Sequence, residues 1–306
     1  MSRAAKQAMG MLWIRRRAGL IPSGAKDTQT ELENIRAHNR RNPYRKPRSL
    51  TVSYSEVPTG RTTCLVIRDR LLFRPERAIL FLRGGIKNSW LDDIRIAERY
   101  SRKAFAEVWF PLYPSIADAP VTEIADAVFS AYREVTERYG GDRVAVVGLS
   151  WGGFLGFQIV DRINRYREPV PMPRYLFAVS PGGFPKEQDD WGFMQSFSEK
   201  DPLMDLPTVE HLEEITGMFG LYMPDHLLYP ANGIYRNAPE TYVYYGEETF
   251  AGNTRAYMKA YERDGAAKQM HMHIEPAIMH SYACSPQFPE GKRELLEQTV
   301  LIRRMK

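Results

Sequence analysis

Ser150 has the sequence surroundings of an enzyme nucleophile. It stands at the centre of Gly148–Gly152, which reads Gly-Leu-Ser-Trp-Gly and follows the uncharged, valine-rich run Val144–Val147. Apolar residues then recur at helical spacing from Phe154 to Ile163, so the segment predicts a buried strand, a tight turn and a helix. Such a turn lifts a serine hydroxyl out of the sheet and places it beside the exposed amides of a helix N-terminus. The pattern therefore favours Ser150 as a nucleophile.

A serine nucleophile needs a base that accepts its proton, and the chain offers six histidines. His38 lies in a basic N-terminal region, and His211 and His226 lie in a segment with the composition of a lid, so we expect these three on the surface or in that lid. His280 follows the predicted strand 270–274 in a loop, where catalytic groups are commonly mounted. Elimination therefore favours His280 as the base, with a surface histidine as the alternative.

The base in turn needs a carboxylate that holds it in the correct tautomer. Glu247 and Glu248 directly follow the predicted strand 241–245. That position is the sheet edge at which the serine turn and the loop of the base also lie. We favour Glu248, because the Thr249-Phe250 pair behind it can anchor the loop. Glu247 stays open as the acid, and an ordinary solvated charge is the alternative for either glutamate.

Gly84 and Gly85 follow another predicted buried strand, 78–82, which precedes the serine strand. Glycines at such a position let backbone amides approach a substrate closely. Each well-aimed donor stabilises a developing oxyanion by about 3 kcal/mol. Together with the amide of Trp151, the two glycines predict an oxyanion hole. A simple turn is the alternative.

Two pairs of residues are of types that bind metal ions. His271 and His273 alternate along the predicted strand 270–274 and so share one face, as two ligands of a metal ion do. No third ligand with suitable spacing is evident in the sequence. Cys64 and Cys284 lie far apart without metal-like spacing, and we expect two buried thiols. The sequence thus predicts neither a metal nor a cofactor.

Extended and helical segments alternate from residue 50 onward. The predicted strands are 50–54, 63–68, 78–82, 108–110, 144–147, 175–180, 241–245 and 270–274, and the predicted helices include 92–105, 124–139 and 254–263. This alternation predicts an α/β fold with a largely parallel sheet covered by helices. Short helices broken by prolines predict a lid insertion at about 184–239. We therefore divide the chain into a basic N-terminal segment, 1–49, and a catalytic domain, 50–306.

The net charge of +5 is unevenly distributed. The first fifty residues hold twelve lysines and arginines against three acids, a balance of +9, so the remainder carries −4. A basic arm of this kind can bind nucleic acid or an anionic membrane surface. No aromatic interleaving or nucleic-acid motif accompanies it, so we expect solvated charge on an N-terminal helical cap and no nucleic-acid partner.

No apolar stretch approaches the length of a membrane span. The candidate nearest the start, 9–14, is far shorter and runs into Arg15–Arg17 without a small-residue cleavage site. We therefore expect no signal peptide, no stable membrane insertion and a cytoplasmic location. The oligomeric state stays open, and a homo-oligomer is compatible with the sequence.

These residues together resemble a known family. Over about residues 60–290 the chain is similar to α/β-hydrolases of the hormone-sensitive-lipase-like group, which includes bacterial acetyl and short-chain esterases and fungal steryl acetyl hydrolases. The resemblance lies in the serine turn and in Leu82–Gly85, Phe110–Tyr113, Ser180-Pro181, Glu199–Leu203 and Met279-His280. It implies that Ser150 is the nucleophile, Glu248 the acid and His280 the base, with Gly84, Gly85 and the Trp151 amide as the oxyanion hole.

The chain departs from the family pattern at two positions of one loop. Arg83 replaces the histidine that begins the family's His-Gly-Gly-Gly motif, and Ile86 replaces its third glycine. The first change alters the hydrogen-bond anchor of the loop, and the second narrows the acyl site. The resemblance also implies that the segment before Leu50 forms a cap together with the inserted helices.

The predicted function is hydrolysis of small acyl esters by a Ser-His-Glu triad through an acyl-enzyme. Water completes the reaction, and the only expected partner is a small-molecule ester. Two alternatives remain, because a fold and a triad define chemistry but not the leaving group. One is a non-catalytic small-molecule-binding protein on the same fold. The other is a peptidase or thioesterase with the same triad.

Overall fold

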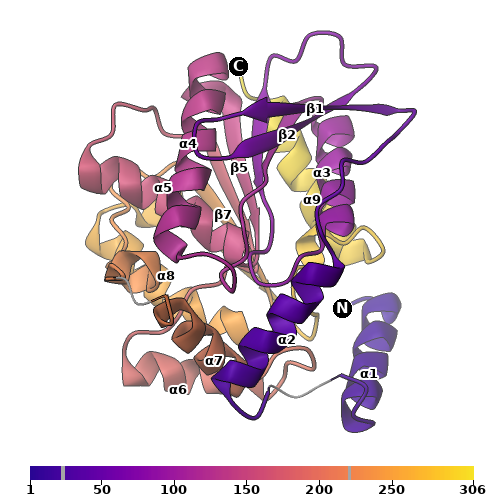
Figure 1. Cartoon of the computed structure of the whole chain (residues 1–306), viewed down its shortest axis with the longest axis vertical. Helices are drawn as coiled ribbons and strands as arrows, with labels where there is room; N and C mark the ends of the chain where they lie inside the picture. The colour runs from indigo at the N-terminus through magenta and orange to yellow at the C-terminus, as the bar shows by residue number, and fades with distance from the viewer. Residues whose placement is uncertain (22–24, 220–221) are drawn as a thin grey trace.

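The central element is a twisted sheet with helices on both faces (Figure 1). The computed structural model describes residues 1–21, 25–219 and 222–306. Within these residues the sheet has eight strands in the order β1-β2-β4-β3-β5-β6-β7-β8. The strands are β1 Val52–Pro58, β2 Thr63–Asp69, β3 Ala78–Leu82, β4 Glu107–Pro111, β5 Val144–Leu149, β6 Tyr175–Val179, β7 Glu240–Gly246 and β8 Met270–Glu275.

Strand direction brings the loops of the predicted triad to one edge. β2 pairs antiparallel with both β1 and β4, whereas β4, β3, β5, β6, β7 and β8 are all mutually parallel. The carboxyl ends of the parallel strands therefore share one edge of the sheet, and loops leave it after β3, β5, β6, β7 and β8. The predicted α/β fold with a mostly parallel sheet is confirmed.

Helices cover both faces of the sheet. Figure 1 shows α3 (Trp90–Ala104) and α9 (Pro289–Arg303) beside each other on one face. On the other face lie α4 (Val121–Tyr139), α5 (Trp151–Tyr166) and α8 (Thr254–Arg263). Alternate residues of β5 enter the two separate cores, since Val146 packs on the α4 and α5 side and Val147 on the α3 and α9 side. Burial on both faces explains why this strand is continuously apolar.

Four further helices lie outside these layers. They are α1 (Arg3–Arg17), α2 (Thr28–Arg41), α6 (Gln188–Ser198) and α7 (Leu206–Gly217). Figure 1 shows α2, α6 and α7 gathered beyond the lower end of the sheet, and α2 packs on α7. Short 3-10 helices complete the structure at η1 Gly141–Arg143, η2 Asp225–Leu227, η3 Pro230–Asn232, η4 Thr249–Asn253, η5 Ala267–Gln269 and η6 Tyr282–Cys284.

The basic N-terminal segment is bonded to the rest of the chain. The Arg16 guanidinium contacts the Asp205 carboxylate at 3.1 Å, and Arg36 donates to the Ala117 carbonyl at 2.9 Å. Part of its charge is therefore paired, where solvated charge was expected. Cys64 and Cys284 are buried free thiols, as predicted. In the described ranges, no helix has the length and apolar character needed to cross a membrane.

Candidate active site

The turn between β5 and α5 is sterically tight. Ser150 has φ +53° and ψ −123°, a left-handed conformation that few residues other than glycine adopt. A Cβ added at Gly148 would overlap the Gly152 carbonyl, and one added at Gly152 would overlap the Leu82 carbonyl of the neighbouring strand. Glycine two residues before and two residues after the serine is therefore required by close backbone packing.

β6 connects this turn to the other predicted groups. The Ser150 amide donates to the Val179 carbonyl at 2.8 Å. The next residue, Ser180, donates its hydroxyl to Glu248 Oε1 and accepts the Ser281 amide at 2.8 Å. Val179 thus contacts the turn after β5, and Ser180 links the loops after β7 and β8. In the sequence, Ser180 stands out only as part of the family resemblance, which gives it no role.

Glu248 and His280 form a pair in which the glutamate is buried and the histidine is partly exposed. His280 Nδ1 is in hydrogen-bond contact with Glu248 Oε2, and the Glu248 side chain is 1% exposed against 21% for His280. The Gly246 amide also donates to Glu248 Oε1, at 3.2 Å. A proton on Nδ1 directed at the carboxylate leaves Nε2 as the nitrogen that can accept a proton.

The adjacent Glu247 has different partners. It pairs with Lys200 of the lid segment at 2.6 Å and accepts the Ala277 amide at 3.1 Å. The hydrogen bond from Lys200 holds the pKa of Glu247 below its usual value. The sequence did not decide which glutamate pairs with His280. The structure distinguishes them, because Glu248 contacts the imidazole and Glu247 contacts an ammonium group.

Two opposing effects set the pKa of His280. Burial disfavours the imidazolium, but the charge of Glu248 and its hydrogen bond outweigh burial, and Asp201 adds to them. The net result is a His280 pKa above its ordinary value of 6.5. Asp201 is 2% exposed and accepts the Thr249 amide at 3.0 Å. Thr249 therefore anchors the acid loop, as the sequence indicated, and its partner Asp201 is a residue to which the sequence gave no role.

Ser150 and His280 lie at the same sheet edge, but no hydrogen bond joins the serine hydroxyl to the imidazole within the described part of the chain. Such bonds are often long or poorly aligned in enzymes without substrate and tighten when substrate binds. The structure thus joins the acid to the base directly, and it joins the serine to both through the backbone of β6.

The loop after β3 lies close to the serine turn. Gly84 lies close to Ser150, since an added Cβ would stand 3.7 Å from the Ser150 Cβ. At Gly85 an added Cβ would be only 2.6 Å from the Trp151 ring. Across the residues that the structure describes, no acceptor occupies the amides of Gly84, Gly85 or Trp151. These are the three donors that the sequence assigned to an oxyanion hole.

The carbonyls of the same loop are all engaged. The Tyr113 hydroxyl donates to the Arg83 carbonyl at 2.6 Å, and the Ile116 amide donates to the Gly85 carbonyl at 2.9 Å. The Ser115 hydroxyl donates to the Ile86 carbonyl at 2.5 Å. These three hydrogen bonds hold the loop after β3 against the segment that follows β4.

Arg83 supplies the remaining anchor. Its side chain is fully buried, and its guanidinium donates to the Gly84 carbonyl at 2.7 Å and to the Tyr113 carbonyl at 2.6 Å. It also stacks on Trp90, with 4.0 Å from Cζ to the ring centroid. Burial raises the pKa of the nearby Asp93 to about 7, and the Arg83 charge opposes this rise. Arg83, which stands where the family motif has a histidine, therefore holds the loop after β3 in place.

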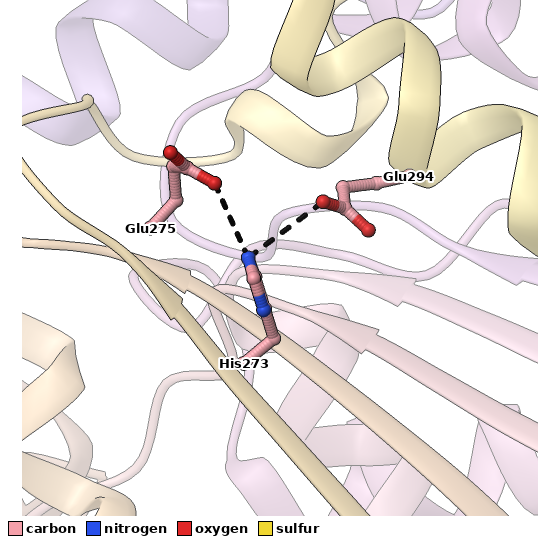
Figure 2. Close-up of side chains that lie close together, drawn as sticks. All are labelled: His273, Glu275 and Glu294. Carbon is pink, nitrogen blue, oxygen red and sulfur yellow. Dashed lines mark hydrogen bonds and ion pairs between the residues drawn. The ribbon is translucent and has the colours of Figure 1, made fainter. Parts of the chain in front are cut away.

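The two alternating histidines do not converge on one site. His271 contacts Glu240 at 2.8 Å. Figure 2 shows His273 Nε2 between two carboxylates, Glu275 at 3.3 Å and Glu294 at 3.7 Å. The ligating atoms of these three residues lie within 4.8 Å of one another.

A side chain already supplies positive charge to that cluster. Arg293 pairs with Glu275 at 2.8 Å and with Glu294 at 2.5 Å. We therefore interpret the cluster as an ion-pair network. Glu275 stands two residues after His273 on the same strand, so alternation could have placed it on the same face. The sequence could not reveal Glu294, because it comes from α9 and meets β8 only in the folded chain.

Comparison with known proteins agrees with this architecture. A family model described as the alpha/beta hydrolase fold matches residues 82–284, so the chain belongs to the α/β-hydrolase family. Comparison with curated protein sequences finds no match.

Solved structures with the same fold include several lipolytic enzymes. One is an esterase from the bacterial hormone-sensitive lipase family, with 18% identity, a TM-score of 0.77 and 100% and 99% coverage of this chain and that chain. Another is an esterase/lipase from an uncultured bacterium, with 15% identity, a TM-score of 0.76 and the same coverages. A third is a hormone-sensitive lipase from a metagenome library, with 19% identity, a TM-score of 0.73 and 99% of each chain covered. At these identities the likeness establishes the fold.

The pairing of His280 with Glu248 predicts a titration behaviour that can be measured without any substrate. Because the carboxylate stabilises the imidazolium, Glu248→Gln is expected to lower the pKa of His280 below that of the unmodified protein. Histidine ring NMR signals followed against pH give this value. The matched change Glu247→Gln at the neighbouring residue is expected to leave it near the unmodified value. Equal effects of the two substitutions would contradict the assignment.

Proposed function

We propose that this α/β-hydrolase cleaves carboxylic esters, with Ser150 as nucleophile, His280 as general base and Glu248 as the acid that orients the base. The observation that carries the proposal is the buried contact between His280 and Glu248 beside the strained serine turn. The likeness of the fold to solved esterases supports the same reaction. No metal or cofactor takes part in the proposed reaction.

The proposed reaction has two halves. His280 accepts the Ser150 proton while the serine oxygen attacks the ester carbonyl, and the amides of Gly84, Gly85 and Trp151 bind the oxyanion. His280 then donates the proton to the departing alcohol, and the carbonyl reforms as an acyl-enzyme. A water molecule, deprotonated by the same histidine, attacks this acyl group and releases a carboxylic acid, which restores the Ser150 hydroxyl.

We further propose that residues 1–49 and the insertion at 184–239 form a cap over this edge of the sheet. The contact between Arg16 and Asp205 joins the two segments, and Lys200 joins the insertion to the acid loop through Glu247. In the insertion, Met194 is fully buried and packs the lid on the body, whereas Trp191 and Phe197 are half-buried. Together with Ile86 in the oxyanion loop, this apolar cap favours small acyl groups.

Serine-dependent ester turnover tests the proposed function. With p-nitrophenyl acetate, butyrate and decanoate, we expect kcat/KM to fall along the series, because the site is narrow. We expect Ser150→Ala to lose about 10³-fold or more on the best substrate. Unchanged turnover in Ser150→Ala would contradict the nucleophile. Activity confined to amides or thioesters would identify a peptidase or thioesterase, and saturable binding without any turnover would identify a small-molecule-binding protein.

The pH dependence of the same assay has a defined sign. Only the neutral imidazole can accept the Ser150 proton, so kcat/KM is expected to fall as the pH drops through the pKa of His280. Since that pKa is raised above 6.5, the acid limb of the profile is expected above pH 6.5. Initial rates measured across this pH range in buffers of constant ionic strength locate the acid limb of the kcat/KM profile. A midpoint clearly below 6.5 would contradict the coupling to Glu248.

The hydrogen bonds of Arg83 predict that its substitution lowers kcat and leaves KM nearly unchanged. Arg83→Met keeps the apolar stem and removes the hydrogen bonds to the Gly84 and Tyr113 carbonyls, so the oxyanion donors lose their fixed position. We expect kcat to fall by about 10- to 100-fold with little change in KM. Far-ultraviolet circular dichroism checks that the variant is folded at the assay temperature. Arg83→Lys, which retains the charge but not the two-pronged geometry, is expected to recover only part of the loss.

A further inference from the structure

An apolar tip lies at the edge of the sheet opposite to the triad. Three of the four most exposed large apolar side chains in the described ranges belong to it, because Leu50 is 95% exposed, Leu71 93% and Phe73 86%. β2 ends at Asp69 and runs antiparallel to β4, so the segment after β2 lies at the amino ends of the parallel strands. The proposed ester site lies at their carboxyl ends, and the tip is therefore distinct from it.

Backbone hydrogen bonds hold the three apolar side chains near one another. The Arg70 amide donates across to the segment before β1 at 3.0 Å, so Leu50 and Leu71 come next on the two sides of the β1–β2 ladder. The Asp69 carboxylate accepts the Leu71 amide at 2.9 Å and turns the chain, and Phe73 follows this turn. Apolar side chains that gather at one exposed place mark an interaction site.

The segments that border the tip carry strong positive charge. They hold eight lysines and arginines against two acids, although the chain after residue 50 carries −4 overall. We call these segments, 68–77, 103–106 and 303–306, the basic edge. In the part of the chain that the structure describes, no carboxylate lies within ion-pair distance of any of the eight cations. Their positive charge is therefore concentrated and not neutralised by these residues.

Hydrogen bonds join the basic edge into one surface. Arg77 Nε donates to the Met305 carbonyl at 2.6 Å, and Arg303 Nε donates to the Lys103 carbonyl at 2.5 Å. The segment after β2 is thus tied to the end of α9, and the end of α9 to the end of α3. Figure 1 shows the C-terminus at the end of the molecule away from α2, α6 and α7.

Structural roles account for only part of this charge. Lys103 and Arg303 lie in the last turns of α3 and α9, where a cation stabilises the helix dipole. Arg68, Arg70 and Arg74 lie outside the helices, and all three are exposed. The charge of these three arginines is therefore available to a partner.

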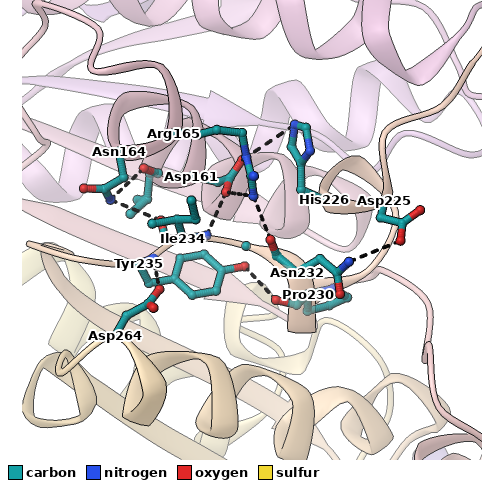
Figure 3. A network of polar contacts seen from close by, with 12 residues as sticks. Asp161, Asn164, Arg165, Asp225, His226, Pro230, Asn232, Ile234, Tyr235 and Asp264 are labelled. Atoms are coloured by element: carbon teal, nitrogen blue, oxygen red, sulfur yellow. Dashed lines mark hydrogen bonds and ion pairs between the residues drawn. The ribbon is translucent and has the colours of Figure 1, made fainter.

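Arg165 shows how a structural arginine is held at the same edge. It lies at the end of α5 and donates to the Asp161 carboxylate at 2.9 Å and to the Asn232 carbonyl at 2.7 Å (Figure 3). Asp161 is 2% exposed. Within the described ranges the arginines beside the tip have no carboxylate of this kind.

The partner of this surface must supply negative charge and an apolar environment together. An anionic lipid surface supplies both, because its phosphates attract arginine and lysine while its acyl boundary accepts leucine and phenylalanine. A nucleic acid offers phosphates but leaves the aliphatic side chains in water. A second copy of this chain in a symmetric dimer would place the basic edge against itself.

We propose that the apolar tip of Leu50, Leu71 and Phe73, with the basic edge around it, docks this protein on the surface of an anionic lipid membrane. The three apolar side chains enter the headgroup region, and the arginines contact lipid phosphates. Docking of this kind is adsorption and needs no helix that spans the bilayer. Because the triad lies at the opposite edge of the sheet, the proposal does not depend on the ester hydrolysis proposed above.

Vesicle binding tests the proposal on the full chain. Vesicles of phosphatidylcholine with about one third phosphatidylglycerol are compared with vesicles of phosphatidylcholine alone. We expect saturable co-sedimentation with the anionic vesicles, binding to the neutral ones that is weaker by about tenfold or more, and loss of binding as salt is raised. The assay contains no ester, so its outcome is independent of the triad.

Paired charge reversals separate the basic edge from overall charge. Arg70→Glu with Arg74→Glu is expected to weaken binding by about 25-fold or more, at about fivefold for each arginine removed. Arg15→Glu with Arg17→Glu changes the net charge equally, at exposed residues of α1. Figure 1 shows α1 away from β1 and β2, so this control pair is expected to change binding by less than about threefold.

The apolar side chains are tested at constant charge. Leu71→Ser with Phe73→Ser is expected to weaken binding by about tenfold or more. Ile14→Ser with Leu20→Ser makes the matched change at two N-terminal side chains that are each 67% exposed, and binding is expected to stay near the unmodified value.

A fluorescent label locates the tip directly. Cys64 and Cys284 are buried, so Leu71→Cys supplies one accessible thiol for an environment-sensitive dye. We expect its emission to shift to the blue with anionic vesicles and to stay unchanged with neutral ones. The same dye on Ile14→Cys is expected to show no shift.

Several results would overturn the proposal. They are equal binding to neutral and anionic vesicles, no binding at low salt, equal losses in the two charge-reversal pairs, or no dye shift at position 71. Binding to duplex DNA without vesicle binding would identify a nucleic-acid surface instead. Circular dichroism checks that each variant is folded, and if one pair fails to fold, the other pair and the label still decide.

Discussion

The close approach of backbones at the β5–α5 turn is the constraint on which the rest of the site depends. Gly148 and Gly152 have no Cβ, so α5 begins directly against β3 and β5, and Ser150 is held at positive φ. The turn is fixed further by the hydrogen bond from the Ser150 amide to Val179. Because β6 continues into Ser180, the same backbone also positions the loops of Glu248 and His280. A looser turn would separate the three loops.

Glu248 and Arg83 are two buried charged residues near the serine turn, and their charges are stabilised by different kinds of partner. Glu248 is nearly inaccessible to water and is satisfied by His280, Ser180 and the Gly246 amide. Arg83 is equally buried. Its two terminal nitrogens donate to backbone carbonyls and its guanidinium lies over the Trp90 and Tyr113 rings, while its Nε has no partner among the described residues. A buried charge without such partners is strongly unfavourable. Each charged side chain thus fixes the loop to which it bonds. A preorganised site requires loops that are fixed in this way.

The segments outside the sheet layers are attached by apolar packing and by polar contacts. Leu32 of α2, Met194 of α6 and Leu212 of α7 belong to the core on the α4 and α5 side of the sheet. Arg16 reaches Asp205, Lys200 reaches Glu247, and Asp161 receives the Ile234 amide from the loop beyond η3. Such contacts are individually weak when exposed and stronger when buried. A cavity lined in part by Gln158 lies at one of these junctions, between α4, α5 and η2.

Local pattern alone determined the strand-turn-helix at Ser150, the alternating α/β layout and the edge of the sheet at which His280 and Glu248 lie. These follow from periodicity and from the steric demands of glycine, which act over a few residues. Only the tertiary structure decided that Glu248 and not Glu247 meets the imidazole, that Arg83 anchors the loop after β3, and that His273 meets Glu294. Each of these pairs joins residues whose side-chain directions are set by packing across the sheet, and packing between distant segments leaves no periodic signal in the sequence.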